Sequence, residues 1–251
     1  MLTNKTIPIV LHRIVKSKAI DFEDVTLENL KVIFGQNKNQ YITVLDDLKI
    51  RQNTNYYMVT FDDGYLSDYE IVYPLINKLK VKATFFINPC NIGKLGFLTW
   101  NMVQEMSNSG LLIGSHGYNH FNMLKLTKND AKREFVMSRR IIEKKIGKPV
   151  NNFSFPYGKF NQDLVNLAFD CGYERCFISK HGVIDSNDNI IPRNSINSKV
   201  NKNKINSLLF VSNKTLIKWQ IEDLGKKFIK ILFGDNLYRK IRSFLFNIKT
   251  V

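Results

Sequence analysis

Strands and helices alternate along this chain, and that pattern restricts the possible folds more than any other feature of the sequence. Short apolar runs are expected as buried strands at 7–11, 56–61, 82–87, 111–115, 152–155 and 174–178. Segments with capping residues and helical spacing are expected as helices at 26–34, 67–80, 100–108, 127–146 and 162–170. This repeated alternation of strand and helix predicts a parallel sheet, either open or closed into a barrel.

Three polar clusters come directly after predicted strands. They are Asp62-Asp63-Gly64, the segment 116–120 with a histidine at each end, and Pro156-Tyr157-Gly158. The carboxyl ends of parallel strands lie at one edge of a sheet or one end of a barrel, where α/β proteins place their functional groups. We therefore expect the three clusters to meet at one site.

The first two clusters have the residue types of a metal centre. Two histidines at i and i+4, with one carboxylate, make a three-ligand site that leaves a position open for water, as catalytic zinc sites do. One of two adjacent aspartates can then bind the metal while the other takes a proton from water. Zinc suits two His and one Asp, although cobalt, nickel or iron would use the same ligands. Taken singly, the paired histidines are a weak signal of a metal site, and the aspartate pair also fits an ordinary Asp-Asp-Gly turn.

Taken together, the clusters match a known set of motifs. Residues 60–65, Thr-Phe-Asp-Asp-Gly-Tyr, resemble the first signature of the polysaccharide deacetylases, the NodB-homology group or carbohydrate esterase family 4. Residues 115–120, Ser-His-Gly-Tyr-Asn-His, resemble its metal-binding histidine pair, and residues 153–158 resemble its third motif. The resemblance spans about residues 7–195.

The resemblance implies an α/β fold of a particular kind, a distorted (β/α) barrel. It also implies a role for each matched residue. Asp63, His116 and His120 would bind a divalent metal, most readily zinc. Asp62 would be the general base, and the backbone N–H of Tyr157 would bind the oxyanion.

The chain departs from the common family pattern at two positions. Ser154 stands where many members carry the arginine that orients the base, and no histidine follows His181 to act as the general acid. A subgroup with circularly permuted motifs is similar in both respects. By that resemblance, His12 at the end of the first strand would be the acid, and Arg193 would orient the base.

The function implied is metal-dependent removal of N-acetyl groups from a polysaccharide or a lipid-linked sugar. Two alternatives remain open at this point. The same residues could hydrolyse another amide, such as a formyl group, or the chain could be an inactive member that binds a glycan.

The composition changes after residue 198. Residues 199–251 hold twelve Lys and Arg against three acidic residues, more than half of the net charge of +15. Basic amphipathic helices are expected at 216–230 and 237–248, a pattern typical of helices on anionic membranes, although helices that cap the barrel would look similar. We expect a catalytic domain at 1–198 and a basic extension at 199–251. Nothing resembles a base-reading module, so no nucleic acid is expected as a partner.

The location expected from the sequence is cytoplasmic and peripheral at the inner membrane face. The first residues lack an apolar leader with a cleavage site. No run approaches the roughly 20 apolar residues of a spanning helix. The three cysteines, at 90, 171 and 176, have no metal-like spacing and fit a reducing compartment.

Overall fold

The computed structural model describes residues 6–35, 40–43, 55–184, 188–212, 214–219, 221 and 224. The chain divides into two compact units, Met1–Phe210 and Val211–Val251. The division thus falls after Phe210, whereas the change in composition suggested a division after residue 198. The intervening residues form helix α6, Lys202–Leu209, which packs against helix α1, Leu27–Ile33, of the first unit.

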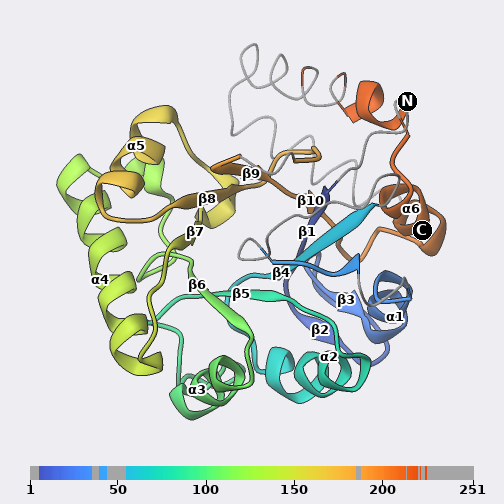
Figure 1. Cartoon of the computed structure of the whole chain (residues 1–251), viewed down its shortest axis with the longest axis horizontal. Coiled ribbons are helices and arrows are strands. Elements are labelled where there is room, and N and C mark those ends of the chain that lie inside the picture. The colour runs from blue at the N-terminus through green and yellow to red at the C-terminus, as the bar shows by residue number, and fades with distance from the viewer. Residues whose placement is uncertain are drawn as a thin grey trace. The chain divides into compact units, whose positions relative to one another are not determined.

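Eight strands of the first unit form a single sheet in which all neighbours are parallel. In sheet order they are β10 Asn194–Ser195, β1 Thr6–Leu11, β4 Tyr56–Phe61, β5 Thr84–Ile87, β6 Leu112–Ser115, β7 Asn152–Ser154, β8 Arg175–Ile178 and β9 Ile190–Pro192. The strands curve around a ring, with the helices of this unit on its outside (Figure 1). This nearly closed parallel barrel confirms the expected fold class.

The two strands at the ends of the sheet are separated by a single residue along the chain. Strands β9 and β10 stand at opposite ends of the sheet order, and Arg193 is the only residue between them in the chain. In the part of the chain that the structure describes, these two strands pair with β8 and β1 and not with each other. The chain therefore crosses the seam of the barrel at Arg193.

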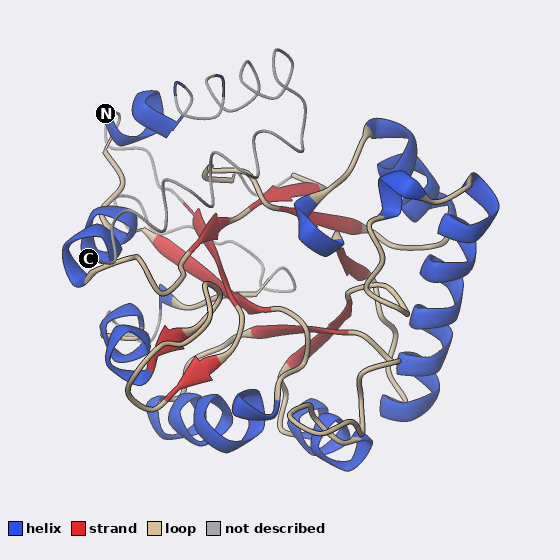
Figure 2. Ribbon diagram, turned by 180° about the vertical axis from the view of Figure 1, so that it is seen from behind, coloured by secondary structure: helices blue, strands red, loops and turns tan. Residues whose placement is uncertain are grey.

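The helices lie around the strands of the barrel (Figure 2), and polar caps set the start of most of them. The side chains of Thr26, Thr99, Thr127, Asn161 and Asn201 each accept a hydrogen bond from a backbone N–H of the first turn, which satisfies one of the donors that a helix start leaves open. The helices that follow β5, β6 and β7 are α3 Trp100–Asn108, α4 Lys128–Ile146 and α5 Gln162–Asp170.

The helix expected at 67–80 differs from a plain α-helix. It begins with a π-helical turn, η2, at Asp68–Val72 and continues as α2, Tyr73–Leu79. Pro74 lies in the first turn of α2, where its missing N–H costs little. Two 3-10 turns, η3 Met123–Lys125 and η4 Pro156–Gly158, follow β6 and β7.

Large apolar side chains fill the space that the strands enclose. Met58, Phe86, Phe177, Ile184 and Ile191 form one buried cluster contributed by β4, β5, β8, β9 and the segment before β9. A filled interior leaves the ends of the strands, and not the centre of the barrel, for chemistry.

Several short elements were not expected from the sequence. They are β9, β10, α6 and the parallel pair β2 Ile14–Val15 and β3 Val25–Thr26. Strands of two or three residues are too short to show an alternating pattern, and Pro192 inside β9 argues against a strand.

The second unit is described only in part. Residues 214–219 are helical. Most of the helix expected at 216–230, and all of that expected at 237–248, lie outside the described residues. No helix within the described ranges is long and apolar enough to cross a membrane.

Candidate active site

The polar clusters that follow β4, β6 and β7 meet at the carboxyl end of the barrel. Asp62 and Asp63 come directly after β4, and His116 directly after β6. His116 Nε2 lies 3.5 Å from Asp63 Oδ1 and 3.8 Å from Asp62 Oδ2. Asp62, Asp63 and His116 are all buried. The parallel sheet thus brings together the residues that the strand-end rule selected.

Asp62 is held by an arginine from the far end of the chain. The guanidinium of Arg193 donates 2.7 Å bonds to both carboxylate oxygens, through Nη1 to Oδ1 and through Nη2 to Oδ2. The same group donates to Thr60 Oγ1 and Ser154 Oγ, and it lies over the rings of Phe86 and Phe177. A two-pronged pair of this kind fixes the plane of the carboxylate as well as its charge.

The small side chain of Ser154 allows Arg193, which lies between β9 and β10, to reach the carboxylate of Asp62. Its hydroxyl donates to Asp62 Oδ2 at 3.0 Å and accepts from Arg193 Nη2 at 2.7 Å. A small side chain at this position leaves room for the buried guanidinium, whose residue is only 1% exposed.

The environment of Asp62 favours its ionised form. Burial is the largest influence and raises the pKa of this carboxyl. The positive charge and hydrogen bonds of Arg193, together with His116 and His12, outweigh burial and hold the pKa well below its ordinary value. Asp62 is therefore a fixed carboxylate beside the histidine pair.

Asp63, His116 and His120 form a group that fits a divalent metal. One ligand atom from each lies within 4.8 Å of the others, and His120 Nε2 is 3.2 Å from Asp63 Oδ1. That oxygen of Asp63 is buried and has no hydrogen-bond partner among the described residues. An orphaned buried carboxylate oxygen between two imidazoles is the environment expected of a cation ligand.

One ring nitrogen of His116 contacts a backbone carbonyl. Its Nδ1 lies 2.7 Å from the carbonyl oxygen of Ser154, so a proton assigned there leaves Nε2 as the free ligand atom. Burial lowers the pKa of His116 to about 4, although the charges of Asp62 and Asp63 raise it. The imidazole is thus neutral near neutral pH, as a metal ligand must be.

Three residues of the site adopt left-handed backbone conformations. The φ angles are 78° at Asp63, 59° at His120 and 58° at Tyr157. Such angles are uncommon for residues other than glycine and occur where surrounding structure holds a functional group in place. The ring of Tyr157 lies 4.6 Å from that of His120, and 64% of this residue is exposed.

His12 lies at the same end of the barrel. It follows β1, and one of its ring nitrogens lies within 4.8 Å of carboxylate oxygens of both Glu23 and Asp63. The remaining histidine, His181, has its Nδ1 3.3 Å from Asn194 Oδ1 and belongs to neither group of possible ligands among the described residues. The geometry therefore places His12 beside Asp63.

A model of the family described as polysaccharide deacetylase matches residues 49–176, half of the chain. The chain belongs to the polysaccharide deacetylase family. The matched segment runs from before β4 to within β8, so it contains the aspartate pair, the histidine pair and Tyr157. The resemblance inferred from the motifs is thereby confirmed.

Two curated relatives cover part of this deacetylase-family chain. A peptidoglycan-N-acetylglucosamine deacetylase of Bacillus cereus is 31% identical over 113 residues, which are 44% of this chain and 39% of the relative. A poly-beta-1,6-N-acetyl-D-glucosamine N-deacetylase of Staphylococcus aureus is 26% identical over 151 residues, 54% of this chain and 52% of the relative. The matches therefore span about half or less of the length of these relatives.

A solved structure has the same fold. The Streptococcus pyogenes deacetylase PplD in complex with acetate superposes with a TM-score of 0.73 at 16% sequence identity. The superposition covers 82% of this chain and 99% of that structure. At this identity the similarity shows the deacetylase barrel and nothing finer.

Three further polar residues of this family member lie near the site and are not among the residues that the motifs select. Asn88, which follows β5, and Glu134 on α4 contact the loop between His116 and His120.

Asp68 in η2 is fully buried, and its two carboxylate oxygens have no partner among the described residues. Burial, and then the charges of Asp63 and Asp62, raise its pKa well above the ordinary value, which favours the neutral acid. The strand-end rule could have found Asn88, but no local signal marks the other two.

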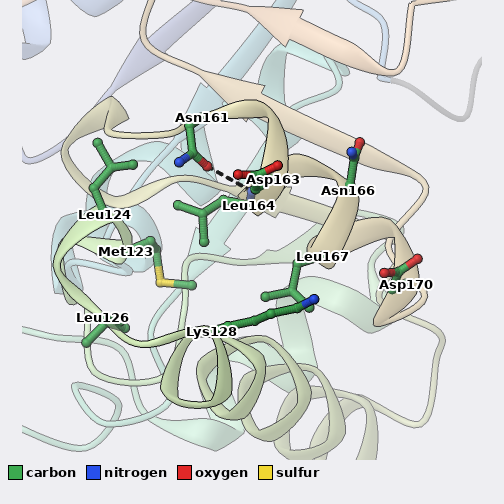
Figure 3. A pocket seen from close by; sticks show the side chains of 10 residues that line it. All are labelled: Met123, Leu124, Leu126, Lys128, Asn161, Asp163, Leu164, Asn166, Leu167 and Asp170. Carbon is green, nitrogen blue, oxygen red and sulfur yellow. Dashed lines mark hydrogen bonds between the residues drawn. The ribbon is translucent and has the colours of Figure 1, made fainter.

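A separate pocket of about 450 Å³ lies outside the cluster of candidate ligands. It lies between η3, the start of α4 and α5, and Figure 3 shows the side chains around it. Apolar side chains of η3 and α5 share its lining with polar ones of α4 and α5. The lining residues are Met123, Leu124, Leu126, Lys128, Asn161, Asp163, Leu164, Asn166, Leu167 and Asp170.

Proposed function

We propose that this chain is a metal-dependent N-deacetylase that releases acetate from N-acetylated sugar units of a polysaccharide. One observation carries the proposal. The Asp62–Arg193 pair holds a carboxylate 3.8 Å from His116, which belongs with Asp63 and His120 to a group of three side chains that suits a divalent metal. Membership of the deacetylase family and the printed activities of the two curated relatives support the choice of reaction and substrate class.

The proposed ligands are Asp63, His116 and His120, with zinc as the metal. Two imidazoles and one carboxylate are a common ligand set for catalytic zinc and leave an open coordination position. A bound divalent metal supplies Lewis-acid chemistry, since it lowers the pKa of water toward about 7 and polarises an amide carbonyl.

The remaining residues act around that centre. Asp62 accepts the proton of the attacking water, while Arg193 keeps the carboxylate ionised and aimed. The backbone N–H of Tyr157 donates to the amide oxygen as negative charge develops on it, which stabilises the transition state. His12 donates a proton to the sugar nitrogen as the C–N bond breaks. The products are acetate and a free amino sugar.

The test of the function is acetate release from a panel of N-acetylated glycans, including peptidoglycan fragments and β-1,6-linked N-acetylglucosamine oligomers. We expect release from at least one glycan, its loss after chelation and its return on addition of zinc. Release that resists exhaustive chelation would contradict the metal requirement. A zinc-loaded protein that releases acetate from no glycan would contradict the activity.

His12 should act as the general acid. We expect His12→Gln to bind zinc normally, to lose activity and to lose the basic limb of the pH–rate profile, because that limb reports deprotonation of the acid. The matched control is His181→Gln, which changes the histidine next to Asn194. If His181→Gln loses the basic limb and His12→Gln keeps it, the assignment is reversed.

We also propose that the substrate is lipid-linked and that the basic segment 199–251 binds an anionic membrane at the inner membrane face. Its lysines lie among apolar residues, and Ile217, Ile221 and Leu224 are 56%, 64% and 66% exposed. Each basic residue near an anionic surface contributes on the order of 1 kcal/mol.

Co-sedimentation with vesicles tests this association. We expect the full chain to sediment with anionic vesicles at low salt. A variant of the full chain with four lysines changed to Gln should not sediment with them; the four are Lys218, Lys226, Lys227 and Lys230. Equal substitution of the four lysines of α4 is the control. Equal loss of binding in the two sets would count against a role for the segment.

A further inference from the structure

The two candidate histidine ligands are joined by a turn of three residues, Gly117, Tyr118 and Asn119. The turn is tight, with a φ angle of 77° at Gly117 and 59° at His120. The separation of the two imidazoles depends on the shape of this turn. What holds the turn therefore controls the ligand geometry.

A buried carboxylate from helix α4 receives the donors of the turn. Glu134 Oε2 accepts hydrogen bonds from the backbone N–H groups of Tyr118 and Asn119, each at 2.8 Å. Glu134 Oε1 accepts from the side-chain amide of Asn119 at 2.6 Å. In all three hydrogen bonds an N–H group donates to Glu134. An ionised carboxylate suits this arrangement because it can only accept hydrogen bonds.

Glu134 is fixed in place by the packing of its helix. It is 6% exposed, although α4 is rich in charged residues that face solvent. One turn further along, the Ser138 hydroxyl donates to the carbonyl of Glu134 and is 2.7 Å from the hydroxyl of Ser115. Ser115 ends β6 and accepts from the N–H of Gly117. The helix therefore holds both the end of the strand and the turn that follows it.

The opposite side of the turn is held by Asn88. Its side-chain amide donates to the carbonyl oxygens of His116 and of Gly117, the latter at 3.2 Å. Glu134 thus accepts from two N–H groups of the turn, and Asn88 donates to two carbonyl groups at its start. A side-chain methyl at position 117 would approach Glu134 Oε2 to 3.4 Å, so the carboxylate lies close beneath the turn.

We propose that Glu134 is a positioning residue that sets the separation of His116 and His120 and so the affinity of the centre for a divalent cation. It contacts neither imidazole and acts through the backbone of residues 117–119. Its buried negative charge also favours a cation at the neighbouring ligands. The inference rests on the proposed metal site.

Three variants of the full chain test this role. Glu134→Ala removes both the acceptor and the charge. Glu134→Gln keeps an acceptor for the two backbone N–H groups and removes the charge, and the amide of Asn119 can turn to meet it. Glu143→Ala is the control, because Glu143 lies on the same helix and accepts from Arg139 Nε and the N–H of Val150, each at 3.0 Å.

Zinc affinity is measured by competition with a chromophoric chelator. We expect Glu134→Ala to raise the zinc dissociation constant by about 10- to 100-fold, as loss of a partner behind a metal ligand commonly does. Glu134→Gln should raise it less, and Glu143→Ala should leave it within about twofold of the unchanged protein, since it touches no part of the turn. An unchanged constant in Glu134→Ala, or an equal rise in Glu143→Ala, overturns the proposal.

Amide hydrogen exchange of the zinc-free protein gives a second readout. The amides of Tyr118 and Asn119 should exchange faster in Glu134→Ala and keep their protection in Glu134→Gln and Glu143→Ala. If the unchanged protein binds no zinc, the proposed metal site fails, and exchange alone decides whether Glu134 holds the turn. Unchanged protection in Glu134→Ala then refutes the role.

Discussion

Replacing Asp63 with alanine should abolish zinc binding and acetate release together. The expected centre has three protein ligands, and the Oδ1 atom of Asp63 is the one that lies near both imidazoles, at 3.5 and 3.2 Å. Two histidines alone would leave the cation without its carboxylate. We expect the same outcome for His116→Ala, since the other ligands cannot move to replace a buried imidazole.

The measurement is zinc content of the purified protein together with the rate of acetate release. Asp163→Ala is a suitable control because Asp163 is an exposed acid on α5, outside the ligand group. Wild-type zinc content in Asp63→Ala or in His116→Ala would show that the ligand assignment is wrong.

Replacing Asp62 with asparagine should leave zinc bound and slow the reaction by roughly 10²–10⁴-fold, the usual contribution of a general base. Asparagine has nearly the same shape and still accepts one hydrogen bond from Arg193, but it cannot take a proton. The rate of acetate release, compared at equal zinc content, measures this effect. Near-full activity would contradict this role for Asp62 and move it to another acid, such as the buried Asp68.

The same substitution should change how stability depends on pH. The pKa of Asp62 is held below its ordinary value in the folded protein, so ionisation of Asp62 stabilises the fold. This stabilisation is fully present above the ordinary carboxyl pKa of about 4, and it is lost as the pH falls from there to the lower pKa of the folded state. We expect the midpoint of thermal unfolding to fall less steeply on acidification in Asp62→Asn than in the unchanged protein. At neutral pH the variant should be less stable, because Arg193 stays buried without its anion.

Much of the fold could be predicted because it depends on local patterns. The strand–helix alternation and the capping residues Thr99, Thr127 and Asn161 each act within a few residues. The seam could not be predicted in the same way. Strands β9 and β10 have three and two residues, and their pairing depends on β8 and β1, which lie far apart in the chain.

The residues of the site also differ in whether a local pattern marks them. Asp62, Asp63, His116 and Tyr157 follow strands, so one rule of parallel sheets was enough to bring them together. Glu134 gave no signal, because one acid on a helix with many charged residues resembles a solvent-facing side chain. Only tertiary packing shows that this carboxylate points inward to the histidine turn.

In the proposed mechanism, the position of Arg193 at the seam couples catalysis to completion of the barrel. Asp62 directly follows β4, but its partner is 131 positions later in the chain, between β9 and β10, which stand at the two ends of the sheet. A barrel that opens at the seam would keep its candidate metal ligands, which follow β4 and β6, and lose the partner that aligns Asp62. Transient opening there would switch off hydrolysis without release of the cation. Activity would then report on closure of the barrel, and zinc content would not.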